Sequence, residues 1–166
     1  MLDNMSELSS LYDQNYTEWA HQNAVLLKTR RFAELDIAHL LEELEDMGKS
    51  DHRELASRLR ILLAHLLKWQ FQYQQLSDKW REFDGRSWRA TIIEQCTSIN
   101  ILLRKKPGLK SVIIDAINDA YPEAVELATN ETGLSIDTFP KTCPYTKEQI
   151  LNTELWEKNT QKYQTS

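Results

Sequence analysis

Glycine is scarce in this chain: only four occur in 166 residues, at Gly48, Gly85, Gly108 and Gly133. Each of them follows a run of apolar residues with helical periodicity. Glycine is common just past the end of a helix because it enters the left-handed region without a steric penalty, and a sheet protein of this size needs many more turn residues. The spacing therefore predicts an all-α protein whose helices end near these glycines.

Composition predicts a single cytoplasmic domain without a cofactor. The formal charge of −5 argues against nucleic acid and anionic membrane as general partners, because both attract a surplus of Lys and Arg. No apolar stretch approaches the ~20 residues that span a bilayer, and residues 1–10 lack the basic start and apolar centre of a signal peptide. Cys96 and Cys143 belong to no metal or disulfide motif, so we expect two reduced thiols.

Apolar periodicity predicts a bundle of about six helices with a long central third helix. The expected ranges are 12–30, 37–47, 50–75, 87–106, 109–120 and 122–131. A strap with two prolines follows over 139–145, and Thr146 with Gln149 forms a capping box that begins a short final helix. We expect residues 1–156 to form one helical domain and residues 157–166 to be a disordered tail.

The predicted helix 37–47 separates apolar from acidic residues. Its expected core face consists of Ile37, Leu40, Leu41, Leu44 and Met47. At about 100° per residue, His39, Glu42 and Asp46 point the opposite way, with Glu43 and Glu45 beside them. Asp36 is the expected N-cap. The helix therefore carries a strongly anionic surface.

His39, Glu42, Glu43 and Asp46 could also ligate a metal, because they recur on one face of this helix. One helix alone cannot easily close a metal site. Asp51 or Glu54 are possible additional ligands, although nothing in the sequence fixes them. We favour a solvated or salt-bridged surface and predict no metal site.

Three candidate binding residues, Arg58, His65 and Trp69, lie on one edge of the predicted helix 50–75. A catalytic histidine needs a partner that fixes its tautomer and a substrate pocket beside it. The sequence shows neither. The simpler interpretation is that His65 packs on Trp69 and donates a hydrogen bond to Glu43 or Glu45.

Basic and aromatic residues alternate between positions 79 and 89. They are Lys79, Trp80, Arg81, Phe83, Arg86, Trp88 and Arg89. Arginines interleaved with indoles can stack bases and neutralise phosphates, but the excess of about two positive charges here is small for tight nucleic-acid binding. We favour a meeting of these arginines with the acidic helix, within the fold or across a dimer. Gln95, on the apolar face of the next helix, is expected to hydrogen-bond a neighbouring element.

Seven short motifs occur in order along the chain. They are Leu35-Asp36, Glu42-Glu43-Leu44-Glu45-Asp46-Met47-Gly48, Ser57-Arg58-Leu59, His65-Leu66-Leu67-Lys68-Trp69, Ser87-Trp88-Arg89-Ala90-Thr91-Ile92, Glu131-Thr132-Gly133-Leu134 and Cys143-Pro144-Tyr145. Together they resemble the bacterial family known as domain of unknown function 29, over about residues 11–156. The resemblance implies a single-domain, all-helical bacterial protein, and it supplies no established reaction.

Two classes of function remain. The leading interpretation is a small protein-binding or regulatory module, antitoxin-like or adaptor-like, that docks another protein or a second copy through its charged and aromatic surface. The candidate binding residues are Glu42, Asp46, Arg58, His65, Trp69, Trp88 and Arg89. The alternatives are a metal-assisted hydrolase that uses His39, Glu42, Asp46 or His65, and a nucleic-acid-binding protein. No catalytic set is recognisable, so the sequence favours a non-enzymatic role.

Overall fold

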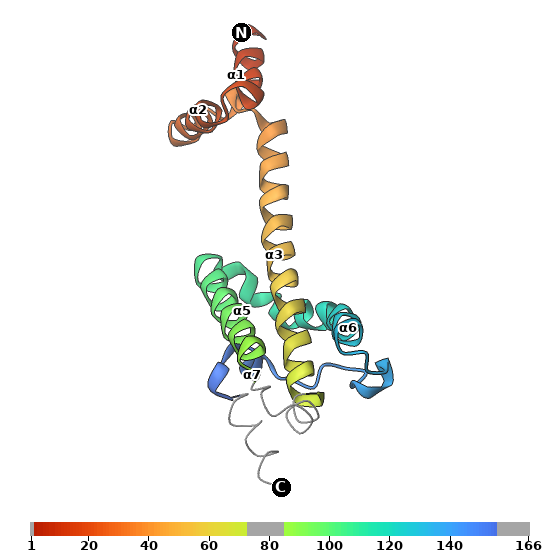
Figure 1. Cartoon of the computed structure of the whole chain (residues 1–166). Coiled ribbons are helices and arrows are strands. Elements are labelled where there is room, and N and C mark those ends of the chain that lie inside the picture. Colours follow the sequence, from red (N-terminus) through yellow and green to blue (C-terminus); the bar gives the residue numbers. More distant parts are fainter. Residues whose placement is uncertain (1, 73–84, 156–166) are drawn as a thin grey trace. The chain divides into compact units, whose positions relative to one another are not determined.

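The computed structural model describes residues 2–72 and 85–155, and within these ranges the protein is helical with no β-strand (Figure 1). The elements in chain order are α1 (Leu2–Gln14), α2 (Tyr16–Lys28), η1 (Phe32–Glu34), α3 (Ile37–Phe71), α5 (Arg86–Lys105), η2 (Pro107–Ser111), α6 (Ile113–Thr132), η3 (Ile136–Thr138) and α7 (Lys147–Leu151). The prediction of an all-α fold with a long third helix is confirmed. No described helix has the length and apolar character needed to cross a membrane.

The chain forms two compact units, an N-terminal unit of residues 1–50 and a C-terminal unit of residues 51–166. Helix α3 begins in the first and continues in the second. The predicted tail, 157–166, lies outside the described residues.

Helix α3 is longer than the glycine pattern predicts. Gly48 was expected to end a helix at residue 47, but α3 runs for 35 residues from Ile37 to Phe71 without interruption. An interior glycine costs only about 1 kcal/mol relative to alanine, and the surrounding Leu, Glu and Met residues favour helix. The expected single helix 12–30 is instead two helices, because Asn15 accepts a hydrogen bond from the Glu18 backbone N–H and caps α2.

Helix α6 also joins two segments that were predicted to be separate. Pro122 was expected to begin a second helix, but it lies inside α6. Ala120 and Tyr121 before it and Ala124 and Val125 after it are all buried, so apolar packing on both sides outweighs the backbone hydrogen bond that proline removes. Gly133 has a φ of 71° and closes α6 in the left-handed conformation, as predicted.

The N-terminal unit has a small core. Among its described side chains, the buried apolar residues are Leu8, Trp19 and Leu35. Asn23 is buried beside them and is fully used, since its Nδ2 donates to the Trp19 carbonyl at 2.8 Å and its Oδ1 accepts from the Asp36 backbone N–H at 3.1 Å. Directional polar contacts therefore supplement a limited apolar interior.

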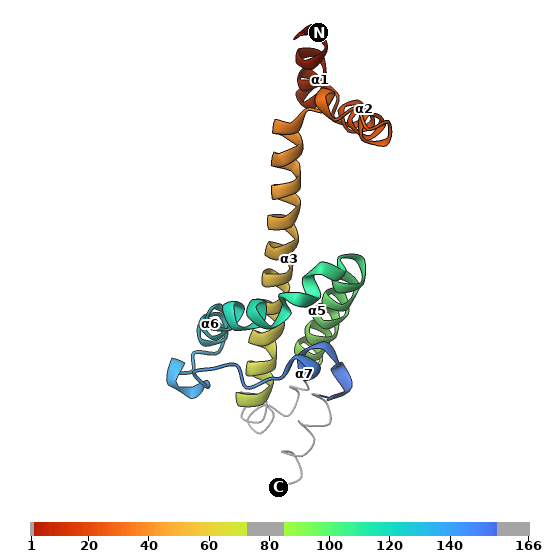
Figure 2. The same ribbon diagram turned by 180° about the vertical axis from the view of Figure 1, so that it is seen from behind.

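The C-terminal unit has a large core around the second part of α3. Helix α5 runs beside α3, and α6 crosses it (Figures 1 and 2). The buried α3 leucines are Leu55, Leu59, Leu62, Leu63, Leu66 and Leu67, and they belong to one cluster of 22 buried residues within the described part of the chain. The predicted central position of this segment is confirmed.

The segment between α6 and α7 includes the predicted strap, residues 139–145, and crosses the end of α3 (Figure 2). Tyr121 donates its hydroxyl to the Pro140 carbonyl at 2.5 Å, and Tyr145 donates to Gln70 Oε1 at 2.8 Å. The strap leads into α7, which begins with the predicted Thr146–Gln149 capping box. These contacts position the strap on the core of the C-terminal unit.

Candidate functional site

An exposed apolar stripe lies on the first part of α3. It consists of Ile37, Leu41, Leu44 and Met47, whose exposed fractions are 56, 53, 63 and 50%. We call these four residues the α3 stripe. The sequence predicted this face as core, and that prediction is wrong, because α1 and α2 engage a different side of α3 through His39 and Glu43.

Acidic residues accompany the α3 stripe. Glu42, Glu45 and Asp46 are all exposed, and helical geometry places Glu45 next to Leu41 with the other two further round the helix. We call these three residues the acidic flank. Two of the candidate binding residues, Glu42 and Asp46, thus lie on the surface as predicted, in the N-terminal unit.

Glu43, by contrast, is occupied within the N-terminal unit. Its two carboxylate oxygens accept hydrogen bonds from Tyr12 at 2.5 Å and from Tyr16 at 2.6 Å. These bonds stabilise the ionised carboxylate and lower the pKa of Glu43. The same contact raises the pKa of Tyr12 to about 12. Glu43 therefore fixes the first two helices to α3.

His39 and Asp36 form a second polar connection. Asp36 Oδ2 lies 2.7 Å from His39 Nδ1 and accepts from Trp19 Nε1 at 2.9 Å. It also accepts from the His39 backbone, as an N-cap does. The hydrogen bond between His39 and Asp36 raises the pKa of His39. Tyr12 stacks on the imidazole, with ring centroids 4.0 Å apart.

Two of the four residues considered as possible metal ligands on this helix have other partners. His39 and Glu43 are engaged as described, and the part of the chain that the structure describes contains no group of three His, Cys, Asp or Glu residues able to hold a metal ion. The geometry therefore adds no support to the metal-assisted hydrolase.

The C-terminal unit brings two of the predicted site residues, His65 and Trp88, around a lysine that the sequence analysis did not single out. Lys68 is buried, and its Nζ lies 2.5 Å from Glu131 Oε2 and 3.4 Å from His65 Nε2. The same ammonium group lies 5.0 Å from the centre of the Trp88 ring. We call these four residues the Lys68 cluster. It joins α3, α5 and the end of α6.

The partner of His65 differs from the expected carboxylate. Its Nδ1 lies 2.8 Å from the Ile61 carbonyl, one turn earlier in α3, so Nδ1 is the donor and Nε2 faces Lys68. Burial is the largest influence on this imidazole and lowers its pKa. The hydrogen bond expected with Glu43 or Glu45 is therefore absent for His65, whose described partners are Ile61 and Lys68.

Arg58 joins α3 to α5. Its Nε donates to Glu54 at 3.1 Å and its Nη1 to Gln95 Oε1 at 3.4 Å. This confirms that Gln95 hydrogen-bonds a neighbouring element. Arg89 is exposed and Trp69 half-buried, whereas Lys79, Trp80, Arg81 and Phe83 lie outside the described residues.

The family motifs contain a signal that could have located the Lys68 cluster. His65 and Lys68 share one motif, Trp88 belongs to a second, and Glu131 belongs to a third. Buried charges are normally paired, so a lysine between His65 and Trp69, in a helix that is predicted to be central, should have a carboxylate partner. Neither Lys68 nor Glu131 is among the candidate binding residues predicted from the sequence.

Within the described residues, these features define an all-α protein with two compact units, a leucine-rich core and an apolar and acidic helix face. The chain belongs to the family described as domain of unknown function DUF29, whose model matches residues 11–156. Comparisons with curated proteins and with solved structures find no match.

Proposed function

We propose that this protein is a small cytoplasmic protein-binding module and that the α3 stripe with its acidic flank is the docking surface. The observation that carries the proposal is the unequal distribution of exposed apolar side chains. Among the described residues, eleven large apolar side chains are exposed, and eight of them lie in the N-terminal unit: Tyr16, Val25, Leu27, Phe32, Ile37, Leu41, Leu44 and Met47. Contiguous exposed apolar surface beside polar residues is typical of an interaction site.

Charge favours a basic partner. Glu45 places a negative charge at one edge of the α3 stripe, Glu42 and Asp46 continue the negative charge round to the other side of the helix, and the whole chain carries a net charge of −5. A partner segment with apolar residues in helical spacing and Lys or Arg beside them would cover the stripe and neutralise the flank. A second copy would instead bring two acidic flanks together, which like-charge repulsion disfavours.

The proposal is tested by affinity capture with the tagged full-length chain at low salt. We expect one protein at near-equal amount, and we expect Leu44→Ser to reduce its recovery at least tenfold. Ile114→Ser is the matched control, because Ile114 is also a helical apolar residue, 59% exposed, but lies on α6. It should retain the partner.

Charge reversal supplies the second part of this test. The Glu45→Lys/Asp46→Lys variant should release the partner at lower salt than the wild type does, whereas Glu126→Lys, an exposed reversal on α6, should not. Equal recovery by Leu44→Ser and Ile114→Ser would refute the docking surface. A dimer in solution that Leu44→Ser dissociates would replace the basic partner by a second copy.

A further inference from the structure

The Lys68 cluster places a buried ammonium group against an imidazole that can itself become a cation. Lys68 Nζ lies 3.4 Å from His65 Nε2, 2.5 Å from Glu131 Oε2 and 5.0 Å from the centre of the Trp88 ring. A nitrogen lone pair, a carboxylate and the face of an indole ring each attract a cation. Because these partners come from α3, α6 and α5, the position of one ammonium group connects the three helices.

The hydrogen bond at the other nitrogen of His65 decides what Nε2 can offer. Nδ1 lies 2.8 Å from the Ile61 carbonyl, which can only accept, so Nδ1 carries a hydrogen whether the ring is neutral or charged. In the neutral ring, Nε2 has a free lone pair and accepts from Lys68. Protonation places a hydrogen on Nε2, and two donors of like charge then face each other across 3.4 Å. The contact that is favourable for the neutral ring is therefore repulsive for the charged ring.

Glu131 is the carboxylate that both cations would share. Among the described residues, the charges that act on the His65 ring are those of Lys68 on α3 and Glu131 on α6. Trp88, from α5, adds an uncharged ring. The described charged residues nearest to it in sequence are exposed, namely Arg86 and Arg89. One partly exposed carboxylate thus faces a lysine and a histidine.

Burial favours the neutral state of this imidazole. It is the largest influence on the ring and lowers the pKa of His65, and the Lys68 ammonium lowers it further. The Ile61 carbonyl and the Glu131 carboxylate act in the opposite direction. Near neutral pH the ring is therefore uncharged and can accept from Lys68.

The lysine is the member of the pair that can move. The His65 ring is held by its bond to the Ile61 carbonyl, whereas a lysine has a flexible stem that can stay in apolar contact while the ammonium group turns to water. The Glu131 side chain is 41% exposed, so the ammonium group can keep this partner as it turns outward.

From this geometry we infer that His65 and Lys68 form a pH-sensitive switch. When His65 is protonated, the Lys68 ammonium leaves Nε2 and the Trp88 ring, and the start of α5 and the end of α6 lose their connection to α3. The leucines of α3 carry no charge, so the core of the unit stays packed in both states. The switch is independent of the docking function proposed for the N-terminal unit.

The test is an NMR titration of the ¹⁵N-labelled full-length chain from about pH 7.5 to 5, the range in which histidine side chains titrate. We expect the Trp88 indole signal and the Gly133 backbone amide to shift with the midpoint of the His65 ring. His65→Gln cannot be protonated but keeps an oxygen that can accept from Lys68. In this variant both signals should become independent of pH.

Two further variants test the electrostatic coupling by its sign. Lys68→Met fills the buried site without a charge, so His65 should bind its proton at least about threefold more tightly. Glu131→Gln removes the shared carboxylate and should weaken proton binding by His65. A histidine that only packs in the core would keep its midpoint in both variants.

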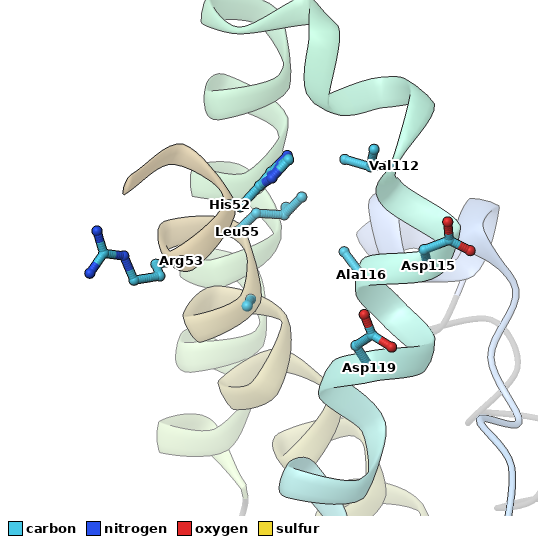
Figure 3. A pocket seen from close by; sticks show the side chains of 8 residues that line it. His52, Arg53, Leu55, Val112, Asp115, Ala116 and Asp119 are labelled. Atoms are coloured by element: carbon cyan, nitrogen blue, oxygen red, sulfur yellow. The ribbon is translucent and has the colours of Figure 1, made fainter. Parts of the chain in front are cut away.

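His52→Gln is the matched control, because His52 is an exposed histidine on the same helix, where it lines a groove of about 380 Å³ between α3 and α6 (Figure 3). It should leave the midpoints of the Trp88 and Gly133 signals unchanged. The dispersion of the amide signals shows whether each variant is folded.

Three results would overturn the switch. They are different midpoints for His65 and Trp88 in the wild type, an unchanged Trp88 titration in His65→Gln, and an unchanged His65 midpoint in Lys68→Met. The first needs no variant, so the proposal stays testable even if a substitution prevents folding. None of these results affects the docking proposal, which concerns other residues and another assay.

Discussion

The contacts that stabilise the N-terminal unit differ from those that stabilise the C-terminal unit. Among the described residues, the C-terminal unit buries 22 in one cluster, whereas the N-terminal unit buries Leu8, Trp19 and Leu35 as its apolar core. The N-terminal unit relies instead on hydrogen bonds from aromatic, imidazole and amide groups to Asp36, Glu43 and the backbone.

This difference has an energetic consequence. A buried aliphatic side chain contributes roughly 1.5–3 kcal/mol, whereas a typical intramolecular hydrogen bond contributes a net ~1 kcal/mol because it replaces a bond to water. Polar contacts can fix the geometry of the N-terminal unit without giving it much stability. The unit with the smaller core is also the one that exposes the α3 stripe, so a partner would supply the apolar contact that the unit lacks.

The largest expected effect lies in the core of the C-terminal unit. Leu63 is fully buried in α3, and Leu63→Ala should lower the free energy of unfolding by about 2–5 kcal/mol through the cavity that it leaves. Denaturant unfolding measures the loss. Leu41→Ala, on the exposed α3 stripe, is the control and should change stability by less than about 0.5 kcal/mol. Equal losses for the two leucines would contradict the assigned burial of α3.

A smaller and local effect is expected in the N-terminal unit. Trp19 is 2% exposed and donates to Asp36, and hydrogen bonds to charged groups contribute about 1.5–3 kcal/mol. Trp19→Phe keeps most of the apolar ring and removes the donor. Hydrogen exchange should accelerate in α2 and the start of α3 while the amides of α5 and α6 keep their protection. Equal acceleration in α5 would mean that the two units unfold together.

Burial should also separate two ion pairs of equal length. Lys68–Glu131 and Arg31–Glu34 each have a closest N···O distance of 2.5 Å, but the Lys68 side chain is only 6% exposed and the Arg31 side chain is 57% exposed. Glu131→Gln leaves a buried ammonium group without its counter-charge and should cost about 1–2 kcal/mol, reduced because Glu131 is partly solvated. Glu34→Gln should leave the melting temperature unchanged. The reverse order would show that Lys68 reaches solvent.

Sequence patterns predicted the C-terminal unit better than the N-terminal unit. The wide leucine face of α3, the Gly133 helix end and the Thr146–Gln149 capping box all follow from local periodicity and capping chemistry, and the structure confirms each. In this unit most apolar residues of a helix face are buried, so amphipathicity is a reliable guide to the core.

The same rule failed for the α3 stripe. An apolar helix face indicates residues that favour burial, but it does not indicate whether the surface that covers them belongs to the same chain. The prediction that a helix ends before Gly48 was wrong for a related reason: glycine has a weak preference for helix ends, and strong neighbouring helix formers outweigh it. The Lys68–Glu131 pair joins residues 63 positions apart, and no single-sequence periodicity reports such a contact.

The smallest expected effects are the pH dependences that two histidines give to the two units. The pKa of His39 is raised above 6.5 by its hydrogen bond with Asp36, so its contribution is fully present below pH 6.5 and is lost as the pH rises through the raised pKa. The hydrogen bonds from His39 and Trp19 outweigh the opposing effect of burial and lower the pKa of Asp36 below 3.8. The Asp36 contribution is therefore present above pH 3.8 and is lost as the pH falls through the lowered pKa.

His65 should give the C-terminal unit the opposite slope. Burial lowers its pKa below 6.5, so below pH 6.5 the unfolded chain binds a proton more readily than the folded unit does. The stability of this unit therefore decreases as the pH is lowered. Proton NMR titration of the imidazole signals should place the midpoint of His39 above 6.5 and that of His65 below it. His39→Gln should flatten the loss of protection in α2 between pH 6.5 and 8, and His65→Gln should flatten the loss in α5 between pH 6.5 and 5. Midpoints in the reverse order would contradict the polar account of the N-terminal unit, because that account requires His39 to hold its proton through Asp36.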